Sequence, residues 1–171
     1  MPVLFAQPDD IPQLLSLVNS AFRGDSARKG WTHESDLLRG AIRTDAVTML
    51  NMMDVLGAAF LTYTNQEGLL EGCVYLCPKQ RGLYLGMLTV NPDLQGGGIG
   101  KQLLQAAEGY ARTQQCIIIY MTVISARTEL VAWYLRHGYY LTGETEPFSV
   151  DTKYGMPTQD LEFIILEKKI P

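Results

Sequence analysis

The chain has 171 residues, of which 47% are hydrophobic and 19% charged, so it is long enough to bury a core and is most simply a single domain. Its formal net charge is −4, and its 14 lysines and arginines are spread along the sequence, which argues against binding to a nucleic acid backbone. Residues 1–22 show neither a signal-peptide pattern nor an apolar stretch that would span a membrane. We therefore expect a soluble cytoplasmic protein with no nucleic acid or membrane partner.

The three cysteines, Cys73, Cys77 and Cys116, are odd in number and irregularly spaced. This pattern favours reduced thiols over a disulfide framework. Because the chain has only two histidines, we also expect no metal site.

The first part of the chain predicts a short strand followed by two helices. Apolar residues recur at helical spacing from Ile11 to Phe22, with Asp10 as the expected N-cap. Arg23 to Gly30 is polar and predicts a loop, after which Glu34 to Leu38 predicts a second short helix capped by Thr32. The strand would be Val3-Leu4-Phe5.

The middle and end of the chain predict strands around two further helices. One helix begins at Ile99 and the other is capped by Ser125 and ends at Arg136-His137-Gly138. The strand after the first of these helices should run parallel to the strand before it, through a right-handed crossover. The expected strands are Val47–Tyr63, Gly68–Leu76, Leu83–Val90, Cys116–Val123, Tyr139–Leu141 and Leu161–Leu166.

The segment from Leu88 to Lys101 runs from an apolar strand through a turn at Pro92 into a glycine-rich helix start. Four glycines in five residues weaken a helix, since each costs about 0.5–1 kcal/mol relative to alanine in a helix interior. Bare backbone at a helix N-terminus, however, lets an anion approach unpaired N–H groups. The segment therefore predicts a phosphate-binding loop, the alternative being a glycine-rich turn with no ligand.

Spacing separates the kinds of phosphate-binding loop. A P-loop requires Ser or Thr after the lysine, but Gln102 follows Lys101. A dinucleotide fingerprint requires a third glycine where this chain has Lys101 or Leu103. The pattern that remains is Gln95-x-x-Gly98-x-Gly100.

This pattern resembles the pyrophosphate-binding motif of the GNAT acyltransferases, which use acetyl-CoA. The resemblance implies an α/β (α+β) fold over residues 1–171 as one domain, with a mostly antiparallel sheet of six to seven strands, one central parallel pair and about four helices. It also implies that backbone groups of the first parallel strand hold the pantetheine arm and that the following turn holds the diphosphate. The implied acetyl-CoA-binding residues are Leu88, Thr89, Val90, Gln95, Gly96, Gly97, Gly98, Ile99, Gly100 and Lys101.

Tyr134 is the residue that the resemblance places in catalysis. Members of the family carry a Tyr-x-x-x-Gly-aromatic sequence at the end of the helix after the second parallel strand, and Tyr134 to Tyr139 matches it. The tyrosine would protonate the leaving thiolate, the alternative being a tyrosine that only packs between helix and sheet. Many members have asparagine seven residues earlier, where this chain has Arg127, which either pairs with a phosphate of CoA or faces away.

The general base and the acceptor site are less defined. Where some members carry a glutamate, this chain has Tyr84, whose ordinary pKa of about 10 makes it a poor base, so we expect deprotonation through water. Glu34, Glu71 and His33 are alternatives for receiving the proton. The candidate acceptor-binding residues are Trp31, Glu34 and Tyr84, although Trp31 fits equally well as a lid packed on the core.

The sequence thus predicts an N-acetyltransferase that transfers the acetyl group of acetyl-CoA directly to a primary amine of a small molecule or peptide N-terminus. The alternative is an acyl-CoA-binding sensor without transfer activity. A third alternative is a nucleotide-dependent phosphotransferase, but the glycine-rich motif lacks the Ser or Thr and the acidic ligands that would hold magnesium. Whether the protein forms a homodimer is left open.

Overall fold

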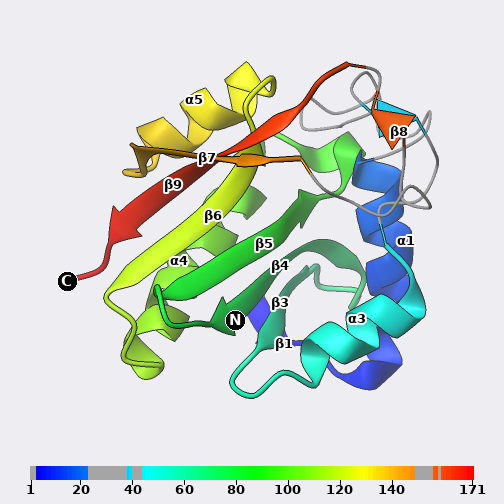
Figure 1. Cartoon of the computed structure of the whole chain (residues 1–171). Coiled ribbons are helices and arrows are strands. Elements are labelled where there is room, and N and C mark those ends of the chain that lie inside the picture. The colour runs from blue at the N-terminus through cyan, green and yellow to red at the C-terminus, as the bar shows by residue number, and fades with distance from the viewer. Residues whose placement is uncertain (1–2, 23–37, 40–43, 149–155, 158) are drawn as a thin grey trace.

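The computed structural model of the protein describes residues 3–22, 38–39, 44–148, 156–157 and 159–171 (Figure 1). Its strands form one seven-stranded sheet and one small two-stranded sheet. The seven strands, in their order across the sheet, are β1 (Val3–Phe5), β3 (Ala59–Thr64), β4 (Leu70–Pro78), β5 (Leu83–Val90), β6 (Ile118–Ile124), β9 (Glu162–Lys169) and β7 (Tyr140–Pro147). The small sheet pairs β2 (Leu38–Arg39) with β8 (Met156–Pro157).

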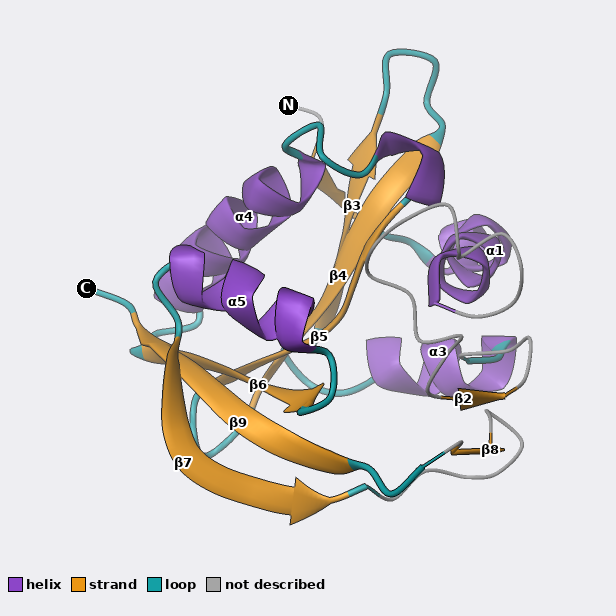
Figure 2. Cartoon of the chain, turned by 90° about the horizontal axis from the view of Figure 1, so that it is seen from above, coloured by secondary structure: helices purple, strands orange, loops and turns teal. Residues whose placement is uncertain are grey.

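Helices cover both faces of the large sheet. In Figure 2, α4 and α5 lie on one side of the sheet and α1 and α3 on the other. The helices of the described residues are α1 (Ile11–Phe22), α3 (Ala46–Met53), α4 (Ile99–Thr113) and α5 (Thr128–Arg136), with short 3-10 turns η1 (Pro8–Asp10) and η2 (Pro92–Leu94). Every helix in the described part of the chain is too short or too polar to span a bilayer.

The expected fold is confirmed. β5 and β6 are the parallel pair, joined through α4, and the other pairs of neighbouring strands in the seven-stranded sheet are antiparallel. The strand β5 and the helix α1 have the predicted bounds, and α4 begins at the predicted Ile99.

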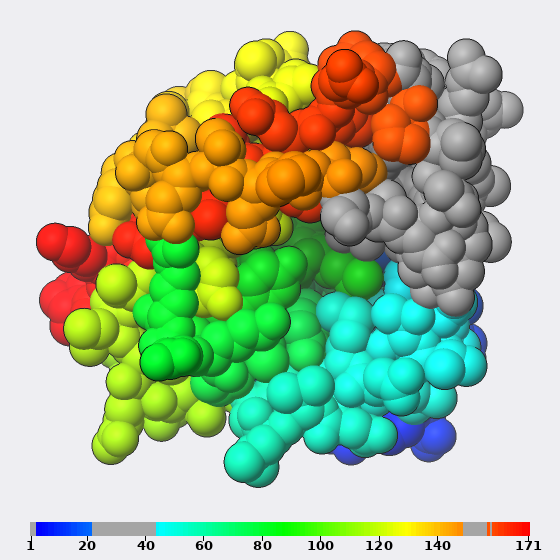
Figure 3. Space-filling view, viewed as in Figure 1, coloured from blue at the N-terminus to red at the C-terminus, as the bar shows by residue number. Residues whose placement is uncertain are grey.

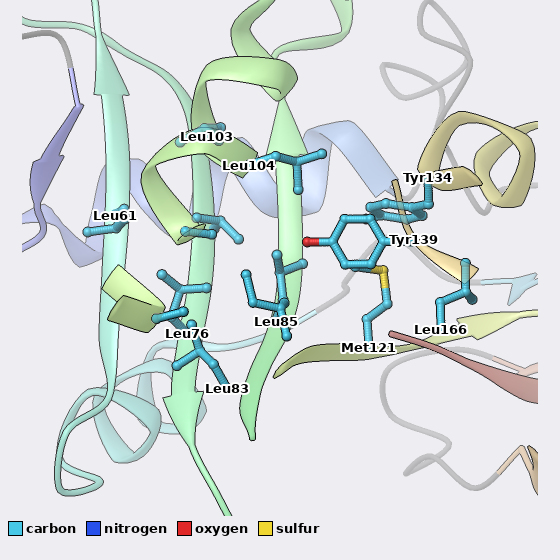
Figure 4. Packing of buried hydrophobic residues seen from close by; sticks show 14 of the residues in the cluster. Leu61, Leu76, Leu83, Leu85, Leu103, Leu104, Met121, Tyr134, Tyr139 and Leu166 are labelled. Atoms are coloured by element: carbon cyan, nitrogen blue, oxygen red, sulfur yellow. The ribbon is translucent and has the colours of Figure 1, made fainter. Parts of the chain in front are cut away.

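Two apolar cores hold the helices against the sheet. Beneath α4 and α5, leucines of β5 and methionine of β6 pack against Leu103, Leu104, Tyr134 and Tyr139 (Figure 4). On the opposite face, Leu14 and Val18 of α1 pack with Met49 of α3 against the aromatic pair Phe60 and Tyr75. Side chains of successive strand residues therefore divide between the two cores, as strand geometry requires.

One predicted strand is wrong in its first half. The expected strand Val47–Tyr63 is a helix, α3, as far as Met53, and β3 begins only at Ala59. The side chain of Asp45 caps this helix by accepting a hydrogen bond from the Thr48 amide at 2.8 Å. Met49 is completely buried against α1. Burial of one face of this short apolar segment, together with the cap, therefore stabilises a helix instead of a strand.

Two smaller predictions also need correction. The N-cap of α5 is Arg127 rather than Ser125, and the helix starts at Thr128. Leu38, expected at the end of a second helix, belongs to the strand β2, whereas residues 32–37 of that predicted helix lie outside the described residues. The C-terminus of α5 is as expected, with Arg136 in the last turn and Gly138 at a φ of 94°.

The parallel pair separates soon after it forms. β5 and β6 are paired only at Leu83 with Ile119 and at Tyr84 with Tyr120. Further along β5, its register with β4 shifts between Gly86 and Thr89, and Met87 has a φ of 49°, which is unusual for a residue with a side chain. Pairing with β6 therefore ends just before this bulge, and the carboxyl halves of the two strands are not paired with each other.

Candidate active site

A cavity of about 520 Å³ fills the gap between β5 and β6. Its lining includes Leu85 and Met121, which belong to the core under α4 and α5, and also Thr122 and Phe163, which alternate with core residues along their strands and so face the other side. The cavity therefore passes through the sheet. In Figure 3, the recess between the orange strand β7 and the green strand β5 marks the face opposite α4 and α5.

The glycine-rich turn forms the end of the cavity nearest α4. Gly98 is the N-cap of the helix, with a φ of 85° that glycine adopts without strain. Among the backbone amides of residues 96–101, the described residues show a backbone hydrogen bond only for Gly97, to Leu94 at 3.4 Å. The amides of Gly96, Gly98, Ile99, Gly100 and Lys101 are thus available to an anion at a helix N-terminus.

Positive charge collects at this end of the cavity. Lys101, Arg127 and Arg136 line it, and no aspartate or glutamate does. The ring of Trp133 lies against Gly100, where an added Cβ would come within 3.2 Å of it, and the ring of His137 is 4.3 Å from that of Trp133. This arrangement suits a polyanionic ligand that extends along α5.

Tyr134 lies deeper in the cavity and is 4% exposed. Burial raises the pKa of its hydroxyl. The charge of Arg127 lowers this pKa by a smaller amount, and the nearby Tyr84 raises it further. Its ring packs edge-on against Trp133 at 5.2 Å and against Tyr139 at 5.7 Å. A buried tyrosine held in this way keeps its proton at neutral pH and is suited to donate it.

Tyr84 approaches the cavity from the other face of the sheet. Its ring lies over Gly86, where an added Cβ would be 2.8 Å from the ring and 2.9 Å from the hydroxyl oxygen. The ring also packs edge-on against Tyr120 at 5.6 Å. Among the described residues the Tyr84 hydroxyl has no hydrogen-bond partner, so it can bind a group that enters from this face.

The structure brings most of the predicted site residues together. Thr89 does not line the cavity, because its side chain is buried and its hydroxyl donates to the Met87 carbonyl at 2.7 Å. Gly97 does not line it either, and Trp31, Glu34 and His33 lie outside the described residues. The predicted residues that do line it are Tyr84, Leu88, Val90, Gln95, Gly96, Gly98, Ile99, Gly100, Lys101, Arg127 and Tyr134.

The side chains of Gln95 and Glu71 make hydrogen bonds that the sequence did not predict. The Gln95 side-chain amide donates to the Val90 carbonyl at 3.2 Å, so Gln95 also fastens the turn to the end of β5. Glu71, an alternative proton acceptor, accepts a hydrogen bond from the Asn65 side chain at 2.9 Å and does not line the cavity.

Several lining residues were not predicted from the sequence. Trp133 and Arg136 belong to α5, the helix that carries Tyr134, and His137 caps its end, so their spacing around Tyr134 would have placed them near the same cavity. Met87 and Phe163 have no such local signal, because a bulge and a distant strand bring them to the cavity.

Comparison with known proteins gives the family. Residues 16–139 match the model of the Acetyltransferase (GNAT) family, which is more than half of the chain. No curated protein sequence matches the chain.

Solved structures share the fold at low sequence identity. A protein from Streptococcus mutans has a TM-score of 0.76 at 15% identity, covering 100% of both chains. Ribosomal-protein-alanine N-acetyltransferase from Brucella melitensis has a TM-score of 0.72 at 18% identity, covering 99% of both. A Salmonella typhimurium protein solved with its cofactor acetyl-CoA has a TM-score of 0.71 at 16% identity, covering 99% of this chain and 93% of that one. The extent of the family match and the shared fold together establish that the chain belongs to the GNAT acetyltransferase family.

Proposed function

We propose that the protein is an N-acetyltransferase that moves the acetyl group of acetyl-CoA to the primary amine of a small molecule or peptide N-terminus, by direct transfer in a ternary complex. The observation that carries this proposal is the cavity that residues from both faces of the sheet line, among them the glycine-rich turn, Tyr134 and Tyr84. Such a cavity admits a donor and an acceptor from opposite faces at the same time. We further propose that residues 1–171 act as one cytoplasmic domain, where the free thiols of Cys73, Cys77 and Cys116 stay reduced.

The donor end fits acetyl-CoA. The amides of the glycine-rich turn, apart from that of Gly97, suit the diphosphate, and the guanidinium of Arg127 and the ammonium of Lys101 supply compensating charge. The separation of β5 from β6 after Tyr84 leaves room for the pantetheine arm between the strands. These residues would place the thioester beside Tyr134.

Acetyl transfer forms a bond between the amine nitrogen and the carbonyl carbon and breaks the bond between that carbon and the CoA sulfur. Tyr134 donates its proton to the departing thiolate, so that free CoA leaves as a thiol. The amine attacks in its neutral form and its surplus proton passes to water. Water then returns a proton to the oxygen of Tyr134, so that the enzyme is regenerated. The Tyr84 hydroxyl orients the amine by hydrogen bonding from the other face of the sheet.

Calorimetry and thiol release test this function together. We expect acetyl-CoA to bind the protein in the absence of acceptor, and a free thiol to appear from acetyl-CoA only with certain amines. The panel would contain polyamines, amino acids, aminoglycosides and peptide N-termini. Binding without thiol release for any amine would indicate an acyl-CoA sensor, and absence of binding would contradict both functions.

A further inference from the structure

The face of the sheet opposite α4 and α5, from which we propose that the acceptor enters, carries a strip of aromatic side chains. Two cationic side chains of the protein lie over part of this strip. On this strip, formed by Tyr84, Tyr120 and Phe163, the Lys79 ammonium lies over the Tyr84 ring at 5.1 Å. The Arg81 guanidinium lies over the Tyr120 ring at 5.4 Å. Within the described residues no cation lies over the Phe163 ring, which lines the cavity and packs against Phe148 at 5.1 Å. Phe163 is thus the position of the strip where a cation from outside can bind.

The carboxylates near this strip are not equally neutralised. Arg81 holds two of them, donating to Glu144 through both terminal nitrogens at 2.8 Å and to Glu167 through Nε at 2.7 Å. The carboxylate of Glu146, which is exposed on β7, has no hydrogen bond or ion pair with the described residues. Of these three carboxylates, that of Glu146 is therefore the one that the described residues leave unneutralised.

Glu146 lies next to Phe163. The two residues are register partners in the antiparallel pair of β7 and β9, so their side chains point to the same face. Burial is the main cause of the raised pKa of Tyr120, and the charge of Glu146 adds to it, in keeping with a carboxylate close to the strip. The carboxylate of Glu146 thus lies beside an aromatic ring that lines the cavity.

Positive and negative side chains therefore lie at different ends of the proposed binding site. The cationic lining residues Lys101, Arg127 and Arg136 all come from α4, α5 or the residue that caps α5, at the end proposed for CoA. Lys79 and Arg81 lie at the opposite end of the aromatic strip, in the turn before β5, with Arg81 fully paired. Of the three described glutamates beside the strip, Glu144, Glu146 and Glu167, only Glu146 has no partner among the described residues, so it can select an incoming cation.

Resting on the proposed function, we propose that the acceptor is a diamine or polyamine, whose reacting nitrogen lies between Tyr84 and Tyr134 and whose second, protonated nitrogen binds Glu146 over the ring of Phe163. The reacting amine must be neutral, so it does not itself satisfy the carboxylate. β7 lies three strand spacings from β5, the strand that carries Tyr84, which is roughly 15 Å across the sheet, and the flexible side chain of Glu146 shortens that span. An aliphatic chain of several carbons bridges such a distance.

The test compares α,ω-diaminoalkanes of increasing length with the primary monoamine of the same length, using thiol release from acetyl-CoA. For wild type we expect the kcat/KM ratio of diamine to monoamine to exceed one and to peak at an intermediate length. In Glu146→Gln this ratio should fall about fivefold, mainly through the KM for the diamine, as for one partly exposed ion pair.

Glu162→Gln is the matched control. It removes the same charge from the residue before Phe163 in β9, whose side chain points to the opposite face, and we expect the ratio to stay unchanged. An unchanged ratio in Glu146→Gln, or an equal fall in Glu162→Gln, would overturn the inference while leaving the acetyltransferase intact. If wild type released no thiol with any amine, the proposed function would fall and this inference with it.

Discussion

At the scale of single residues, the two tyrosines of the Tyr134–Tyr139 pair differ in what surrounds their hydroxyls. Both side chains are 4% exposed, but Tyr134 lines the cavity, whereas the hydroxyl of Tyr139 is buried without a hydrogen-bond partner among the described residues. Figure 4 shows both rings in the core under α4 and α5. We therefore expect substitution of Tyr134 to affect catalysis and substitution of Tyr139 to affect stability.

Removing the Tyr134 hydroxyl should slow transfer without weakening acetyl-CoA binding. We expect Tyr134→Phe to lower kcat by about a hundredfold, the lower end for loss of a general acid, because no other described proton donor is identified beside the thioester position. The dissociation constant of acetyl-CoA, measured by calorimetry, should change by less than about twofold, since the amides of the glycine-rich turn are untouched. An unchanged kcat would remove Tyr134 from the mechanism.

Removing the Tyr139 hydroxyl should stabilise the protein. A buried hydroxyl without a partner costs about 1–3 kcal/mol, so Tyr139→Phe should raise the free energy of unfolding by about 1 kcal/mol. Tyr75→Phe is the matched control, because the Tyr75 hydroxyl donates to the Met52 carbonyl at 2.9 Å, and its loss should destabilise by about 1 kcal/mol. Urea unfolding measures both, and destabilisation by Tyr139→Phe would mean that a bound water satisfies the hydroxyl.

At the scale of elements, the close approach of α4 to β4 fixes where the glycine-rich turn lies. Gly72 of β4 faces α4, and an added Cβ would lie 2.9 Å from Ile99, 3.0 Å from Leu103 and 3.0 Å from the Thr89 carbonyl. Ile99 and Leu103 form the first turns of α4, directly after Gly98. A small residue in a strand thus sets the position of the helix N-terminus that lines the cavity.

Two glycine substitutions should act in opposite directions. Gly72→Ala should lower the free energy of unfolding by about 1–3 kcal/mol, because it overpacks the interface with α4, and should weaken acetyl-CoA binding by moving the turn. Gly109→Ala, inside α4 with no atom within 4 Å of the added Cβ, should raise stability by about 0.5–1 kcal/mol and leave binding unchanged. Chemical denaturation and calorimetry test both. Equal stability of Gly72→Ala and wild type would contradict this account of the interface.

At the scale of the whole molecule, the two cores bury several groups that ionise in alkaline solution. Burial raises the pKa of the Cys73 thiol from 9.0 to about 12, although a hydrogen bond with Thr89 lowers it slightly. Burial also raises the pKa of Tyr134 and of Tyr139 above the ordinary value. In each case the folded state holds its proton more tightly than the unfolded state.

Stability should therefore fall as the pH rises above about 9. Between the ordinary pKa and the folded one, the unfolded chain binds fewer protons, so the free energy of unfolding drops by about 1.4 kcal/mol per pH unit for each such group. Cys73→Ala should reduce the slope of unfolding free energy against pH between about pH 9 and about pH 11 by the contribution of one such group. Cys116→Ala should reduce it less, because that thiol is only partly buried. Stability that is independent of alkaline pH would contradict the burial of these groups.

Much of the fold was predictable because local signals define several elements. The helix α1 and the strand β5 follow from periodicity and from the breaks at Pro8 and Pro92, and Gly138 marks the end of α5. The short apolar segment from Val47 to Met53 matched a strand as well as a helix, and only burial of Met49 against α1 decided its form. Register was not predictable, since the bulge at Met87 depends on pairing with β4.

The sequence by itself determined the glycine-rich turn, its helix and the tyrosine that follows the second parallel strand, because those features are contiguous and their backbone chemistry is local. Only the tertiary structure decided which groups meet across the sheet. Tyr84 and Tyr134 approach one cavity from opposite faces, and Glu146 lies beside Phe163. These residues are separated by many positions in the chain, so their contacts depend on strand order and register, which are set by packing rather than by any local pattern.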